Sequence, residues 1–73
     1  MAAADVIKIA RTLRAKSLRD LGADSNIDFT VLCRLERGIP PTDDHVRRIA
    51  RALRFRSENF RRAIELSNDR DPR

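Results

Sequence analysis

The stretch SLRDLGADSNIDFTVLCRLERG, residues 17–38, decides the fold of this chain. It opens with Ser17, a favourable N-cap residue, and Asp20 three residues later completes a capping box that predicts the start of a short helix. Asn26 enters the left-handed backbone region at low cost, so it predicts a tight turn. Asp28 predicts the cap of a further helix, which ends at the final glycine of the stretch. Two short helices joined by a tight turn are therefore expected here.

Helical patterns continue on both sides of this stretch. Before it, between Asp5 and about Ala15, apolar residues recur at helical spacing and form a stripe of Val6, Ile9, Ala10 and Leu13. After it, residues 39–41 predict a loop, because prolines lack a backbone donor and keep the preceding residue extended.

Two more helices are expected beyond the loop. Thr42 predicts the cap of a fourth helix, whose buried stripe is Val46, Ile49, Ala50 and Leu53. Ser57 predicts the cap of a fifth helix. The residues of this helix that are expected to face the core are Phe60, Ala63 and Ile64. No alternation typical of strands occurs, so the 73 residues predict one all-α domain, a compact bundle of about five short helices over residues 1–67. The polar residues 68–73 predict a disordered tail.

Composition narrows the classes of function. Sixteen Lys and Arg against eleven Asp and Glu give a net charge of +5, which favours nucleic acid or an acidic protein surface as partner. Cys33 and His45 are the only soft metal ligands, so no disulfide, metal site or cofactor is expected. Glycine-rich phosphate loops and an evident catalytic group are missing from the sequence, so an enzyme is not expected. No apolar run approaches the ~18 residues of a spanning helix, and one unpaired thiol suggests a reducing, cytoplasmic setting.

The helix after the tight turn has two different faces. Val31, Leu32 and Leu35 fall on one side at about 100° per residue. The other side carries Phe29, Thr30, Cys33, Arg34 and Arg37. Arg can pair with guanine, Thr can contact several bases, and an aromatic ring can touch a thymine methyl group. The face therefore suits DNA bases, although a solvated polar face of an amphipathic helix would also look like this.

Several of these residues follow a known pattern. The run Ser17-Leu18-Arg19-Asp20-Leu21, then Ile27, then Leu-Glu-Arg-Gly at residues 35–38 with Pro41 after it, resembles the Xre-like helix-turn-helix family of the lambda-repressor and Cro type. Residues 46–53, with their Ile-Ala-Arg-Ala-Leu run, resemble the family's fourth helix. The resemblance covers residues 6 to 60.

The resemblance implies a lambda-repressor-like fold and a DNA-binding transcriptional regulator, repressor-like and of bacterial or phage origin. Its third helix would enter the major groove of double-stranded DNA. There it would contact the bases through Phe29, Thr30, Cys33 and Arg34. Phosphates would be contacted by Ser17, Leu18, Arg19 and Arg37. By family analogy, a two-fold homodimer on a palindromic site is expected.

The resemblance also assigns structural roles. Gly22 takes the place of the small residue at the helix crossing, where the family usually has Ala. The family commonly pairs the Glu of its Glu-Arg-Gly run with an arginine of the first helix, so Glu36, just before Gly38, would pair with Arg11 or, if the first turn is shortened, with Arg14.

Some features depart from the family pattern. Ser25 occupies a usually apolar position, and Asn26 replaces the usual turn glycine. Three carboxylates lie near the presumed DNA face, where phosphates would repel them: Asp20, Asp24 and Asp28.

Positive charge is concentrated after the loop, not on the third helix. A basic patch is expected on the fourth helix, opposite its apolar stripe, from Arg47, Arg48, Arg51 and Arg54. It would be a solvated face, a phosphate contact or a dock for an acidic protein surface. The last interpretation favours an alternative function, a small phage-type regulator that binds host RNA polymerase and inhibits or modifies transcription through protein contacts. An antitoxin is a third, weaker alternative.

Overall fold

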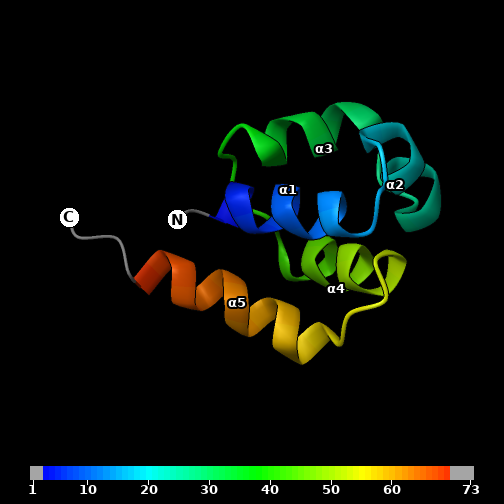
Figure 1. The fold of residues 1–73 in the computed structure, drawn as a ribbon. Helices are drawn as coiled ribbons and strands as arrows, with labels where there is room; N and C mark the ends of the chain where they lie inside the picture. Colours follow the sequence, from blue (N-terminus) through cyan, green and yellow to red (C-terminus); the bar gives the residue numbers. More distant parts are fainter. Residues whose placement is uncertain (1–2, 70–73) are drawn as a thin grey trace.

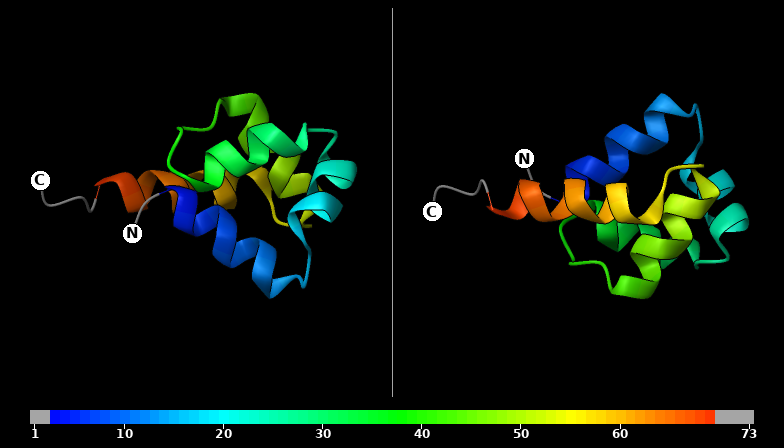
Figure 2. Two further views of the ribbon diagram at one scale, coloured as in Figure 1. Left: turned by 90° about the horizontal axis from the view of Figure 1, so that it is seen from above. Right: turned by 90° about the horizontal axis from the view of Figure 1, so that it is seen from below.

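The computed structural model describes residues 3–69, and within them it confirms an all-α bundle without strands (Figure 1). The helices are α1 (Ala3–Leu13), α2 (Leu18–Ser25), α3 (Phe29–Glu36), α4 (Asp43–Ala52) and α5 (Ser57–Asp69). Helix α1 packs against both α3 and α5, whereas α2 packs against α3 and α4. The Cα radius of gyration is 11.2 Å, as expected for a compact domain of this length. The start of α1 and the end of α5 lie at the same end of the molecule (Figures 1 and 2).

Every helix contributes apolar side chains to one core. The fully buried large side chains are Ile7, Leu21, Leu32, Leu35, Ile49 and Leu53. The predicted stripe of α4 is confirmed, because all four of its residues are buried. On α5, Phe60 and Ile64 are buried as predicted, but the prediction for Ala63 is wrong, because this residue is exposed. Residues of the predicted tight turn also join the core, since Ile27 is only 7% exposed.

The apolar stripe predicted for α1 is wrong, because most of it does not face the core. Ile7, which does not belong to the predicted stripe, is fully buried, and Ala10 is also buried. Ile9 and Leu13 are 46% and 73% exposed, and Val6 is half-buried. The side of α1 that faces the core is thus centred on Ile7 and Ala10, and the larger apolar stripe lies on the flank.

Helices α1 and α5 differ from prediction at both of their ends. Helix α1 begins two residues earlier than expected, and it ends at Leu13, before Ala15 adopts a left-handed conformation with φ 56°. Ser57 is the first residue of α5 and not its cap. Helix α5 continues through Asp69, two residues into the predicted tail, and residues 70–73 lie outside the described part of the chain.

The start of α4 is confirmed and is stronger than predicted. The Thr42 hydroxyl accepts a hydrogen bond from the His45 backbone amide at 3.1 Å, and His45 Nδ1 accepts one from the Thr42 amide at 3.2 Å. His45 therefore completes a capping box, a role that its position three residues after Thr42 could have indicated. Across residues 3–69, none of the helices has both the length and the apolar character needed to cross a membrane.

Candidate nucleic-acid interface

The N-terminus of α2 is held by the predicted capping box. Ser17 Oγ accepts a hydrogen bond from the Asp20 amide at 3.0 Å, and the Asp20 carboxylate accepts one from the Ser17 amide at 3.4 Å. Of the predicted phosphate contacts here, Ser17 and Arg19 are exposed. Leu18 is half-buried and packs against the core, so a phosphate contact at this position would have to use its backbone amide.

The tight turn after α2 has the predicted left-handed residue. Asn26 adopts φ 59° and ψ 36°, and the Ile27 amide donates to the Gly22 carbonyl at 3.2 Å. A Cβ on Gly22 would lie 3.1 Å from the Ile27 carbonyl oxygen and 3.6 Å from Leu32 Cδ1, which explains the need for a small residue at this crossing. Ser25 is buried, and its hydroxyl donates to the Leu21 carbonyl at 2.6 Å, so this polar residue is satisfied inside the turn.

An ion pair joins α1 to the end of α3. Arg11 Nε and Nη2 donate to the two carboxylate oxygens of Glu36 at 2.8 and 3.1 Å, and Arg11 Nη1 donates to the Lys16 carbonyl at 2.9 Å. The side chains of Arg11 and Glu36 are 16% and 10% exposed. The hydrogen bonding of Arg11 to the Glu36 carboxylate raises the pKa of Arg11. The pair holds α3 to α1 from the inner side, which leaves the outer face of α3 unobstructed.

The partner that the sequence left open is therefore Arg11. Arg14 makes other contacts: its Nε donates to the Leu53 carbonyl at 2.9 Å, and its guanidinium carbon lies 4.3 Å from the centre of the Phe55 ring. Arg14 thus links α1 to the segment between α4 and α5.

The outer face of α3 has the predicted residues, with differing exposure. Phe29 is 40% exposed, Thr30 and Arg34 are exposed, and Cys33 is half-buried. The Arg19 guanidinium carbon lies 5.2 Å from the centre of the Phe29 ring, so α2 and α3 together present a cation supported by an aromatic ring. This cation–π pair joins a predicted phosphate contact to a predicted base contact, and spacing alone did not indicate it.

The C-terminal end of α3 adds one more exposed cation. Arg37 is the exposed C-cap residue, and the Ile39 amide closes the turn by donating to the Arg34 carbonyl at 3.1 Å. Gly38 adopts φ 120°, a conformation that side chains with a Cβ rarely adopt, and this ends the helix.

Two of the three carboxylates near this face have local partners. Asp20 belongs to the capping box of α2, and Asp24 forms an ion pair with Lys16. Asp28 occupies the N-cap position of α3, but its side chain makes no capping hydrogen bond, which corrects the prediction of a side-chain cap. Local pairing therefore offsets part of the repulsion that these residues would exert on phosphates.

The structure brings three of the four basic-patch residues beside the tight turn. Arg47, Arg48 and Arg51 line a hollow of about 370 Å³ together with Asp24, Ser25, Asn26 and Asp44. Asp44 pairs with Arg47 at 2.9 Å and with Arg48 at 2.8 Å. Arg54 does not line this hollow; it follows α4 with φ 64°. Such exposed pairs stabilise a fold by only a few tenths of a kcal/mol, so these arginines contribute little to the stability of the domain.

No group of three or more His, Cys, Asp or Glu side chains within residues 3–69 is placed to hold a metal ion. No protein-family model, curated protein or solved structure matches this chain.

Proposed function

We propose that this protein is a DNA-binding transcriptional regulator, repressor-like and of bacterial or phage origin, whose α3 enters the major groove. The observation that supports this most is the outer face of α3, where Phe29, Thr30 and Arg34 are exposed on a helix whose inner side is fixed to the core. Arg37 is exposed at the C-cap of the same helix. The major groove admits an α-helix, and arginine and threonine are suited to base edges. The Xre-like resemblance of the sequence is a second support for the proposal.

The residues divide into two roles in this proposal. Arg34 and Thr30 are exposed on α3 and can therefore reach base edges. Arg34 pairs with guanine, the base that arginine commonly recognises, and Thr30 contacts a neighbouring base. Arg37, Arg19 and the amide groups at the start of α2 contact phosphates and fix the orientation of the helix. The ring of Phe29 limits the motion of the Arg19 guanidinium, which lies over its face. The exposed edge of the same ring contacts a base.

Regulation would be steric and would take place in the cytoplasm, where bound protein excludes RNA polymerase from a promoter. Helix α3 has 8 residues and is therefore about 12 Å long, which spans about three or four base pairs. One such helix recognises too few bases to be selective. We therefore propose that two copies bind the two halves of a palindromic site.

Selection from random DNA duplexes followed by fluorescence anisotropy tests this function. We expect a consensus sequence and, with about five phosphate contacts, a slope of log affinity against log salt near −4 to −5. Failure of the selection to return a consensus would contradict the proposal.

The alternative partner is host RNA polymerase. The observation that favours this alternative is that the arginines are concentrated on α4 and α5 and not on α3. Transcription in vitro from a promoter that lacks any selected site separates the two functions. Inhibition that survives Arg34→Glu but is lost in an Arg47→Glu, Arg51→Glu double variant would support polymerase binding. Repression confined to templates with a selected site would support DNA binding.

A further inference from the structure

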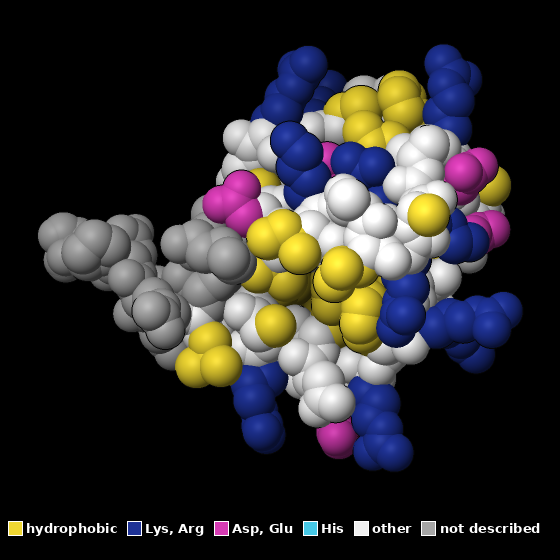
Figure 3. Space-filling model, in the orientation of Figure 1, with side chains coloured by type: hydrophobic (Ala, Val, Ile, Leu, Met, Phe, Trp, Pro, Cys, Tyr) yellow, Lys and Arg dark blue, Asp and Glu magenta, His cyan; other side chains and the backbone are white. Residues whose placement is uncertain are grey.

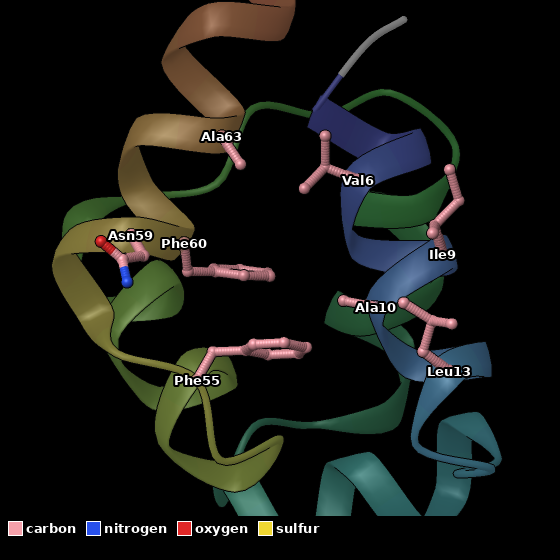
Figure 4. A pocket seen from close by; sticks show the side chains of 8 residues that line it. All are labelled: Val6, Ile9, Ala10, Leu13, Phe55, Asn59, Phe60 and Ala63. Atoms are coloured by element: carbon pink, nitrogen blue, oxygen red, sulfur yellow. The ribbon is translucent and has the colours of Figure 1, made fainter.

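A second surface of the molecule is an apolar groove between α1 and α5 (Figure 4). It has a volume of about 340 Å³ and is lined by Val6, Ile9, Ala10, Leu13, Phe55, Asn59, Phe60 and Ala63. Asn59 is the one polar residue in this lining. The rings of Phe55 and Phe60 stack with their centres 6.0 Å apart and form one wall, which faces the side chains of α1 (Figure 4).

The groove is open to solvent and is edged by large apolar side chains. Leu13 is 73% exposed and Ile9 is 46% exposed. Figure 3 shows hydrophobic side chains gathered between α1 and α5 on this face. Leu66, which is 54% exposed, lies one helical turn beyond Ala63 on α5. A contiguous apolar surface of this kind, rimmed by polar residues, is typical of a site that another molecule covers.

The border of the groove beside Phe55 and α5 carries several basic residues. The exposed residues Arg54 and Arg56 are the chain neighbours of Phe55, and Arg62 is that of Ala63, whereas the exposed acidic neighbours of lining residues are Asp5 and Glu58. The guanidinium of Arg14, which lies over the Phe55 ring, places one cation directly at the edge. An apolar trough with a cationic border is complementary to an apolar ridge with an anionic border.

We propose that this groove binds an amphipathic helix of a partner protein, with a stripe of apolar residues flanked by Asp and Glu. The apolar residues would enter between α1 and α5 at the spacing i, i+3, i+4 and i+7, and the carboxylates would meet the basic rim. A second copy of this chain fits less well, because a two-fold contact would set its basic rim against an identical one. The proposal does not depend on DNA binding, since α1 lies between this groove and α3 (Figure 1).

Fluorescence anisotropy with a synthetic peptide tests the proposal on the full chain. The probe is a fluorescein-labelled helical peptide of about 15 residues with leucines at i, i+3, i+4 and i+7 and glutamates beside them. A second peptide has lysine at each glutamate position. We expect the glutamate peptide to bind at least about tenfold more tightly than the lysine peptide at low salt, and this preference to shrink as salt rises. Equal binding of the two peptides, or no binding of either, would overturn the proposal.

Matched variants show whether the peptide occupies this groove. Ala63→Glu places a carboxylate in the wall and should weaken binding of the glutamate peptide by about tenfold or more. Ala23→Glu, the same change at an exposed residue of α2, should leave the affinity unchanged. Because Ala63 is exposed and glutamate is a good helix former, circular dichroism should show both variants folded.

Exchange of charge on the rim gives a second, independent readout. The double variant Arg56→Glu, Arg62→Glu should lose affinity for the glutamate peptide and gain it for the lysine peptide.

Sedimentation velocity without peptide tests whether a second copy of the chain occupies the groove instead. A dimer that Ala63→Glu converts to a monomer would assign the groove to a second copy and would overturn the proposal. A selected DNA duplex should bind wild type and Ala63→Glu equally, so this test fails or succeeds separately from that of DNA binding.

Discussion

Removal of the Glu36 carboxylate should destabilise the protein more than an ordinary surface substitution. Glu36→Ala deletes two hydrogen bonds of 2.8 and 3.1 Å and leaves the Arg11 guanidinium, 16% exposed, with its single bond to the Lys16 carbonyl. Breaking a fully buried pair costs about 3–5 kcal/mol. Since Arg11 keeps one partner and some access to water, we expect a loss of about 2 kcal/mol.

Urea denaturation followed by far-ultraviolet circular dichroism measures this loss. In a domain of this size a loss of about 2 kcal/mol corresponds to a decrease in Tm of about 8–16 °C. A double-mutant cycle with Arg11→Ala should give a coupling energy of about 1 kcal/mol or more. The same cycle with Arg14→Ala should be additive within about 0.5 kcal/mol, because Arg14 contacts Leu53 and Phe55 instead. A loss below about 0.5 kcal/mol for Glu36→Ala, or coupling to Arg14, would refute this reasoning.

The pKa of Arg11 predicts how this contribution depends on pH. The pKa is raised in the folded state, chiefly by the hydrogen bond to Glu36. A raised pKa adds stability that is fully present below the ordinary arginine value and is lost only as the pH rises through the raised value. We therefore expect the part of the coupling that depends on Arg11 ionisation to be constant across the neutral range.

The remaining predictions concern the turn, the cap and the outer face of α3. Asn26→Ala should destabilise the fold by about 1 kcal/mol in urea denaturation, because alanine lacks the ability of asparagine to adopt φ 59° at low cost; an unchanged midpoint would contradict a left-handed turn. Ser17→Ala should destabilise the fold by about 1 kcal/mol through loss of the bond to the Asp20 amide, whereas Ser17→Asp should retain most of the stability. Arg34→Ala should weaken binding to a selected duplex by about 1–3 kcal/mol and relax the preference at one base pair, whereas Arg51→Ala should weaken binding evenly on selected and random duplexes. Equal losses on both duplexes for Arg34→Ala would exclude a base contact by that residue.

Local chemistry accounts for the parts of the fold that the sequence predicted well. Ser17 and Thr42 each cap a helix through atoms within three residues, and Asn26 adopts its left-handed conformation at the end of α2, where its amide donates to the Gly22 carbonyl. Such interactions do not depend on where the other helices lie, so a single stretch of sequence is enough to place them. The outer face of α3 was also predictable, because exposure there follows from the buried positions of Leu32 and Leu35 on the opposite side.

The direction of α1 could not be predicted in the same way. Its residues offer two overlapping apolar faces, one with Ile7 and Ala10 and the other with Ile9 and Leu13. Periodicity favours the longer stripe, but only contact with α3 and α5 decides which face enters the core. The exposed stripe became one wall of the groove, a surface that exists only because α5 lies beside α1.

Sequence alone was enough to predict five helices, the caps at Ser17 and Thr42 and the left-handed turn before α3, because these depend on contacts between residues a few positions apart. Tertiary structure decided which of two arginines one turn apart would reach Glu36. Arg11 donates hydrogen bonds to both the Lys16 carbonyl and the Glu36 carboxylate. The Leu53 carbonyl and the Phe55 ring meet at Arg14. Those partners come from segments distant in sequence, and their positions are known only once the helices have packed.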